Sequence, residues 1–270
     1  MNGTLESGRT AAGVPYWVAR GRGETWLAIT HGSFGDHREF EPFLPRLMER
    51  ANVLLWDLPG HGGAVNLPPA RRLDEAADYL AQIMALAKVP RAHQLGFSLG
   101  GMIAQALARN HPALAASVIA YACVPVYRTK VPLRPVTRAL VRLQHHLTPW
   151  PKFCATFAKQ MTVVEQLEQD FYPRLLAQSP KVRDAIWEAM IAGTRDEPSF
   201  AFHCPVAQIV GSRDDRFPGG QAAMEILGRL TPPNLRRVIP GAGHWVHAEQ
   251  PASFEAALLS LLDELNVRQC

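Results

Sequence analysis

The chain has 270 residues, of which 47% are hydrophobic, and its formal net charge is +4. This apolar content supports a sizeable core and excludes a disordered chain, and the mild charge without a Lys/Arg tract argues against nucleic-acid binding. No apolar run approaches the ~20 residues that span a bilayer, and residues 1–20 lack the apolar core of a signal peptide. Four widely spaced cysteines, without metal-type spacing, indicate reduced thiols, so we expect a cytoplasmic protein without metal or cofactor.

Strand-like and helix-like segments alternate along the first half of the chain. Helical spacing of apolar residues covers residues 36–50, 73–88 and 99–110. Short apolar runs between these segments predict buried strands at residues 26–30, 53–56, 92–97 and 117–122. Such alternation favours an α/β fold with a mostly parallel sheet covered on both faces.

The alternation stops after about residue 125 and resumes near residue 203. Residues 126–202 contain helical segments and prolines but no convincing strand, whereas strand signals return at 205–210 and 236–240. We therefore expect a core formed by residues 1–125 and 203–270, interrupted by a helical cap at 126–202. Such a cap would exclude water from a site below it and select substrates.

The pentapeptide Gly96-Phe97-Ser98-Leu99-Gly100 lies between a predicted strand and a predicted helix. A G-x-S-x-G sequence in that context is typical of a nucleophile elbow, a sharp turn that exposes the serine. Glycines two residues either side of Ser98 avoid collisions that larger side chains would cause there. We therefore expect Ser98 to attack an acyl carbon.

A serine nucleophile needs a base and an acid, and both are found after later strands. His244 follows the last predicted strand in a glycine-rich loop, and the carboxyl ends of strands form the sites of open α/β sheets. The acid is Asp214 or Asp215, after the strand at 205–210, and we choose Asp214, three residues past Gly211. We expect His247 to be structural.

The oxyanion formed during acyl transfer needs backbone N–H donors. The N–H of Leu99 is one candidate, because it directly follows the nucleophile at the start of a helix. The other is Ser33, in the loop after the strand at 26–30. His31 in the same loop is expected to hold structure rather than to act as a base.

In this order the motifs resemble those of the α/β-hydrolase fold superfamily, in its serine-nucleophile, esterase- or lactonase-like branch. The resemblance covers nearly the whole chain and is carried by His31-Gly32, Asp57-x-Pro59-Gly60-His61-Gly62, Gly96-x-Ser98-x-Gly100-Gly101, Gly211-x-x-Asp214 and Gly243-His244. It implies an eight-stranded sheet with one antiparallel strand near the start, the first two strands being supplied by residues 4–9 and 16–19. The loop at Gly63-Ala64-Val65 departs from the family, which often has a serine there.

The combined expectation is a serine hydrolase that cleaves a carboxylic ester, lactone or thioester through an acyl-enzyme on Ser98. Two alternatives stay open: a C–C bond hydrolase acting on a vinylogous diketone with the same triad, and a non-hydrolytic cyclase or ligand-binding member of the fold. We expect Phe34, Phe97 and Trp245 to line an apolar substrate pocket together with cap aromatics.

Residues 125–164 carry seven Lys or Arg side chains and no Asp or Glu. In a helix starting near Pro135, Arg134, Arg138 and Arg142 form a basic stripe opposite apolar residues. One interpretation is a solvated polar face, with the apolar side packed on the core. The other is a docking surface for an acidic carrier protein or an anionic substrate such as coenzyme A or a carboxylate.

Overall fold

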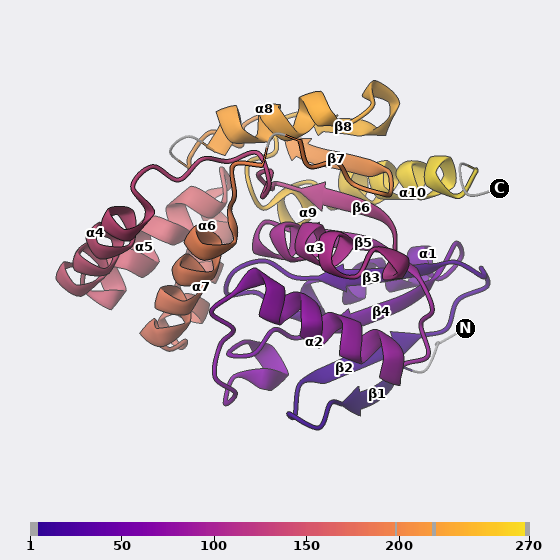
Figure 1. Ribbon diagram of the computed structural model, residues 1–270, viewed down its shortest axis with the longest axis horizontal. Coiled ribbons are helices and arrows are strands. Elements are labelled where there is room, and N and C mark those ends of the chain that lie inside the picture. The colour runs from indigo at the N-terminus through magenta and orange to yellow at the C-terminus, as the bar shows by residue number, and fades with distance from the viewer. Residues whose placement is uncertain (1–4, 198, 218–219, 268–270) are drawn as a thin grey trace.

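The structure is a computed structural model that describes residues 5–197, 199–217 and 220–267. An eight-stranded sheet forms its centre (Figure 1). The strands, in the spatial order β1-β2-β4-β3-β5-β6-β7-β8, are β1 (Leu5–Arg9), β2 (Pro15–Ala19), β4 (Asn52–Trp56), β3 (Trp26–Thr30), β5 (Ala92–Phe97), β6 (Ala115–Tyr121), β7 (Val206–Gly211) and β8 (Arg236–Ile239).

Strand β2 is antiparallel to both of its neighbours, and the pairs from β4 through β8 are parallel. This confirms the predicted mostly parallel sheet with one antiparallel strand near the start. The predicted first strand began at Thr4, which lies outside the described residues. The inner strands β3, β5, β6 and β7 are buried along their whole length, as expected when helices cover a parallel sheet.

Helices pack on this sheet and bring the loops of interest to its edge. The helices of the core are α1 (Leu44–Leu47), α2 (Leu73–Leu86), α3 (Leu99–Asn110), α8 (Gly220–Leu230), α9 (Val246–Glu249) and α10 (Pro251–Val267). Helix α3 packs against α2 and against strands β5 and β6, while α10 packs against β7 and β8. Strand β5 ends at Phe97 and helix α3 begins at Leu99, so the predicted nucleophile Ser98 lies in the turn between them.

The prediction of one continuous helix over residues 36–50 is wrong. In its place the chain forms two short 3₁₀ turns, His37–Glu39 and Glu41–Phe43, followed by the four-residue helix α1. Pro42 and Pro45 have no backbone N–H, so a regular hydrogen-bond ladder cannot run through this segment. Its apolar spacing still buries Phe40, Phe43 and Leu44.

Four helices follow β6 and precede β7: α4 (Arg134–Leu147), α5 (Trp150–Met161), α6 (Glu165–Leu176) and α7 (Pro180–Gly193). They gather at one end of the molecule, away from both chain ends (Figure 1). Among the described residues of this stretch, the β contact is an isolated bridge between Arg128 and Asp196. Within the described ranges, no helix combines the length and hydropathy that crossing a membrane requires.

Candidate active site

Ser98 occupies a sharp turn between β5 and α3. Its backbone has φ 48° and ψ −109°, a strained conformation for a residue other than glycine. The elbow closes only because its neighbours are small: a Cβ on Gly96 would collide with the backbone of Gly100 and Gly101, and one on Gly100 would collide with the Thr30 carbonyl oxygen. The turn thus presents the Ser98 side chain at the carboxyl edge of the sheet.

His244 lies between Ser98 and Asp214 in the structure. Its Nε2 is 3.0 Å from Ser98 Oγ, and its Nδ1 is 3.0 Å from both carboxylate oxygens of Asp214. With the proton on Nδ1 donated to Asp214, Nε2 accepts from the serine hydroxyl. Asp214 and His244 are buried, whereas Asp215 is exposed, so the structure brings the first aspartate of the pair to the imidazole.

Close backbone packing holds the two loops that carry this acid and base. Gly211 ends β7 so near to Ala242 and Gly243 that a Cβ would collide with their carbonyl oxygens. The Gly243 N–H donates to Glu249 Oε2 at 2.7 Å, which anchors the residue before His244. The glycines at these positions therefore permit the approach on which the Asp214–His244 contact depends.

The two predicted oxyanion donors lie on different elements, a helix and a loop. Leu99 is the first residue of α3, and Ser33 follows the end of β3 and borders the same cavity as Ser98. Phe34 next to Ser33 has φ 64°, and the Gln178 side chain donates to its carbonyl oxygen at 2.8 Å. Gln178, between α6 and α7, had no sequence signal because this contact joins residues 144 positions apart.

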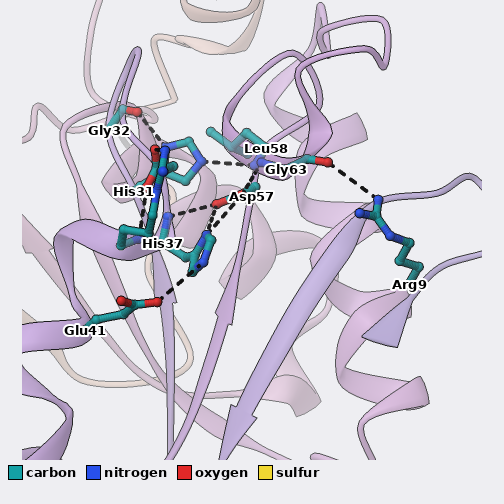
Figure 2. A network of polar contacts seen from close by, with 10 residues as sticks. Arg9, His31, Gly32, His37, Glu41, Asp57, Leu58 and Gly63 are labelled. Atoms are coloured by element: carbon teal, nitrogen blue, oxygen red, sulfur yellow. Dashed lines mark hydrogen bonds and ion pairs between the residues drawn. The ribbon is translucent and has the colours of Figure 1, made fainter. Parts of the chain in front are cut away.

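A buried hydrogen-bond network supports this loop from below (Figure 2). His31 Nδ1 lies 2.8 Å from the Gly32 carbonyl, and its Nε2 accepts from the Leu58 N–H, which agrees with the expected structural role. Asp57 accepts from the His37 backbone and ring, at 2.8 and 2.9 Å, and from the Gly63 N–H at 2.6 Å. The loops after β3 and β4 are thereby fixed to each other beside Ser33.

A cavity of about 700 Å³ opens in front of Ser98 and His244. Its wall includes Cys123, Gln144, Lys152, Phe153, Phe157 and Trp187. Burial raises the pKa of the Cys123 thiol to about 12, so this neighbour of the site stays protonated and unreactive. The described residues contain no cluster of three or more His, Cys, Asp or Glu side chains that could hold a metal ion.

The three aromatic residues predicted for the pocket wall lie behind it in the structure. Phe34 is buried and packs edge-on against Phe157, which does face the cavity. Phe97 stacks on Tyr121 at 4.9 Å between ring centres, and Trp245 donates its indole N–H to His247. Side chains of helices α4, α5 and α7 instead form much of the wall.

His247 is structural in its contacts, as the sequence suggested. It is buried, its Nδ1 lies 3.1 Å from the Tyr121 hydroxyl, and its Nε2 accepts from Trp245. Burial also raises the pKa of Tyr121 well above its usual range. The contacts of His247 therefore hold the loop of His244 against β6, and His247 does not line the cavity.

The orientation of α4 contradicts the interpretation that its apolar side packs on the core and its basic stripe is solvated. Arg138 and Arg142 pair with Glu188 on α7, and Arg134 donates to the Thr194 carbonyl. The helix buries none of its residues, and its apolar side is exposed. Acidic residues on α7 account for this orientation, because they attract the arginine face inward.

Comparison with known proteins places the sequence of the chain in a family. A sequence model described as the alpha/beta hydrolase family matches residues 27–257. The chain belongs to this family. It is also similar in structure to a thermophilic esterase from Thermogutta terrifontis, with a TM-score of 0.78, 21% identity, and 97% of this chain and 99% of that chain covered. The enol-lactonase from Burkholderia xenovorans LB400 gives a TM-score of 0.76 at 18% identity, with 96% and 100% covered.

Curated relatives of this alpha/beta hydrolase carry different activities. A 2-succinyl-6-hydroxy-2,4-cyclohexadiene-1-carboxylate synthase from Enterobacter sp. (strain 638) is 29% identical over 95% of this chain and 96% of its own length. A pimeloyl-[acyl-carrier protein] methyl ester esterase from Aeromonas hydrophila is 34% identical, over 38% of this chain and 40% of its own. Members of the family are generally hydrolases, but their reactions differ. The geometry of the site is therefore needed to choose among these reactions.

Proposed function

We propose that this protein is a serine hydrolase that cleaves a carboxylic ester, lactone or thioester through an acyl-enzyme on Ser98. The observation that carries the proposal is the continuous contact from Ser98 Oγ through His244 to Asp214, each step 3.0 Å long, at the floor of a cavity. A binding role would not require this arrangement, whereas activation of a hydroxyl does.

In the proposed reaction, Ser98 Oγ attacks the substrate carbonyl while His244 Nε2 takes its proton. Asp214 stabilises the imidazolium through Nδ1–H. The N–H groups of Ser33 and Leu99 hold the oxyanion, and the α3 N-terminus adds a favourable dipole. His244 then protonates the leaving group, and a water molecule, deprotonated by the same imidazole, hydrolyses the acyl-enzyme and regenerates Ser98.

The cavity wall favours a partly apolar acyl group of small to medium size. Aromatic and aliphatic side chains from α5 and α7, such as Phe153, Phe157 and Trp187, contribute to it. We propose that residues 126–202 act as a cap that shields the acyl-enzyme and selects substrates through these side chains.

The synthase reaction is the second candidate, because that relative matches nearly the whole chain. That relative is named for a product with a succinyl and a carboxylate group, so its substrate carries several negative charges. Among the described residues of the wall, Lys152 is the one permanently cationic side chain. The ester reaction therefore fits this cavity better, and a C–C bond hydrolase is the further alternative on the same triad.

A carrier-bound acyl chain is a narrower version of the proposal. The Aeromonas relative is named for an acyl-carrier-protein ester, and Arg142 on α4 keeps 69% of its side chain exposed beside its contact with Glu188. A cytoplasmic location also belongs to the proposal, since Cys123, Cys154 and Cys204 are free thiols.

Hydrolysis of p-nitrophenyl acetate, butyrate and octanoate by the wild type and by Ser98→Ala tests this function. We expect the mutant to lose roughly 10³-fold or more in kcat, and the chain-length trend to measure the depth of the pocket. An inactive wild type with a reactive Ser98 would exclude simple esters and favour a C–C bond or a carrier-bound substrate. Equal rates for both proteins would contradict the proposal.

A further inference from the structure

Helix α4 presents a continuous apolar face to the outside of the molecule. Leu133 is 76% exposed, Leu140 61% and Leu147 69%, and Val136 and Leu143 are about half exposed. Scattered exposed leucines are ordinary on protein surfaces, but four large apolar side chains aligned on one helix, preceded by Leu133 at its N-cap, mark an interaction site. We name these five residues the α4 stripe.

The stripe faces outward because the opposite side of α4 is committed to α7. Arg138 and Arg142 pair with Glu188, and His145 Nδ1 lies 2.8 Å from an Asp184 oxygen. Turning the stripe inward would break these ion pairs and bury apolar side chains against carboxylates. The orientation is therefore a property of the folded protomer.

The spacing of the stripe is that of a helix-pairing seam. Its members are separated by 3, 4, 3 and 4 residues, which is the a/d pattern of two heptads. The positions beside the seam are Thr137, Ala139, Gln144 and His146, none of which is permanently charged. Two copies of α4 can thus meet along this seam without repulsion between like charges.

We propose that the α4 stripe is where a second copy of this chain docks, α4 against α4, around a twofold axis near Leu140. In such an isologous contact the same residues serve both partners, and Leu140 faces its own counterpart. Gln144, beside the seam, also lines the cavity in front of Ser98, so the contact borders the mouth of the proposed active site.

Other occupants fit the stripe less well. A helix that lies on an anionic membrane carries Lys and Arg along the polar face that is free to meet headgroups, whereas Arg138 and Arg142 are turned toward Glu188. An acidic carrier protein docked on the stripe would need cations at the positions directly beside it, and those positions are uncharged. Arg142, which an acidic carrier could reach, lies on the opposite face of α4. Leucine and valine at heptad spacing are complementary to another helix of the same kind.

The contact is expected to be weak and dependent on concentration. A 14-residue helix is about 21 Å long and about 10 Å wide, so one face offers on the order of 200 Å². Stable interfaces bury about 800 Å² on each partner. Pairing through α4 therefore belongs with transient dimers, and a single concentration is not an adequate test.

Sedimentation velocity over a wide range of protein concentration tests the proposal. The variants are Leu140→Glu, which sets two carboxylates opposite each other at the axis, and Leu86→Glu on α2. Leu86 is a matched control because it is 50% exposed and lies outside the α4 stripe. We expect the wild type and Leu86→Glu to convert from monomer to dimer as concentration rises, and Leu140→Glu to stay monomeric with an unchanged circular dichroism spectrum.

A cross-linking measurement keeps the proposal testable if Leu140→Glu folds poorly. In a background with Cys204→Ser and Cys270→Ser, Leu140→Cys should form a disulfide-linked dimer on oxidation, whereas Leu86→Cys should not. A wild type that stays monomeric at every concentration, or equal cross-linking at both positions, would overturn the proposal. Binding of a monomeric wild type to phosphatidylglycerol vesicles, lost in Leu140→Glu, would overturn it in favour of a lipid surface.

Discussion

Removal of the Asp57 carboxylate tests how the loops beside Ser33 are held. The side chain is fully buried and accepts from the His37 ring, the His37 N–H and the Gly63 N–H (Figure 2). Asp57→Asn keeps the shape, but its amide group faces at least one of these donors. Breaking a buried pair on one side costs about 3 kcal/mol, which corresponds to a decrease of about 6–12 °C in Tm for a domain near this size.

The chain offers a matched control at its surface. Asp78 also pairs with a histidine, His111, at 2.7 Å, but its side chain is 66% exposed. An exposed pair contributes about 0–1 kcal/mol, so Asp78→Asn should shift Tm by less than about 4 °C. The comparison separates the buried network from His–Asp pairing in general.

The pH dependence of the Asp57 effect follows from its pKa. Burial alone raises the pKa of this carboxyl, but the hydrogen bond from His37, the nearby His31 and backbone N–H groups together lower it. Its stabilisation is therefore fully present above the ordinary pKa of about 3.9 and is lost as pH falls through the lower folded-state value. Thermal unfolding of the wild type and Asp57→Asn should differ at pH 7 and converge at acidic pH.

Two outcomes would refute this reasoning. One is a cost of Asp78→Asn as large as that of Asp57→Asn at pH 7. The other is a difference between the wild type and Asp57→Asn that stays constant as pH is lowered to the point of acid unfolding. Either would show that the carboxylate of Asp57 is not what holds the two loops.

Three further predictions follow from other contacts. Gln178→Leu removes the hydrogen bond to the Phe34 carbonyl beside Ser33, so steady-state kinetics should show a kcat about tenfold lower and a KM little changed. An unchanged kcat would exclude a positioning role for Gln178. Because its pKa is raised to about 12, Cys123 should resist iodoacetamide at pH 8 in the folded protein and react in urea, as read by mass spectrometry. Gly96→Ala places a Cβ against the backbone of the elbow, so soluble yield or Tm should fall sharply.

The elbow and its partners could be predicted because their constraints are local or follow chain order. Glycines around Ser98 are dictated by collisions within a few residues, and the loops of Asp214 and His244 follow strands whose carboxyl ends share one edge. The structure places all three side chains in contact. Their catalytic roles and the division into core and cap stay predictions.

Features that depend on tertiary neighbours could not be predicted in the same way. The pattern of α4 shows two faces, but which face turns inward depends on Glu188, whose position beside α4 is set by the fold. Likewise, Phe97 and Trp245 are aromatic residues near the site in sequence, yet their rings pack behind it. The contact of Gln178 with the loop after β3 had no motif to reveal it.

The central claim is that Ser98 is an activated nucleophile. Treatment of the folded wild type with a fluorophosphonate, followed by intact-protein and peptide mass spectrometry, tests it most directly. We predict one adduct, located on Ser98, that is absent from Ser98→Ala and forms far more slowly in His244→Ala. An unlabelled wild type, or a Ser98→Ala protein labelled as readily as the wild type, would contradict the account.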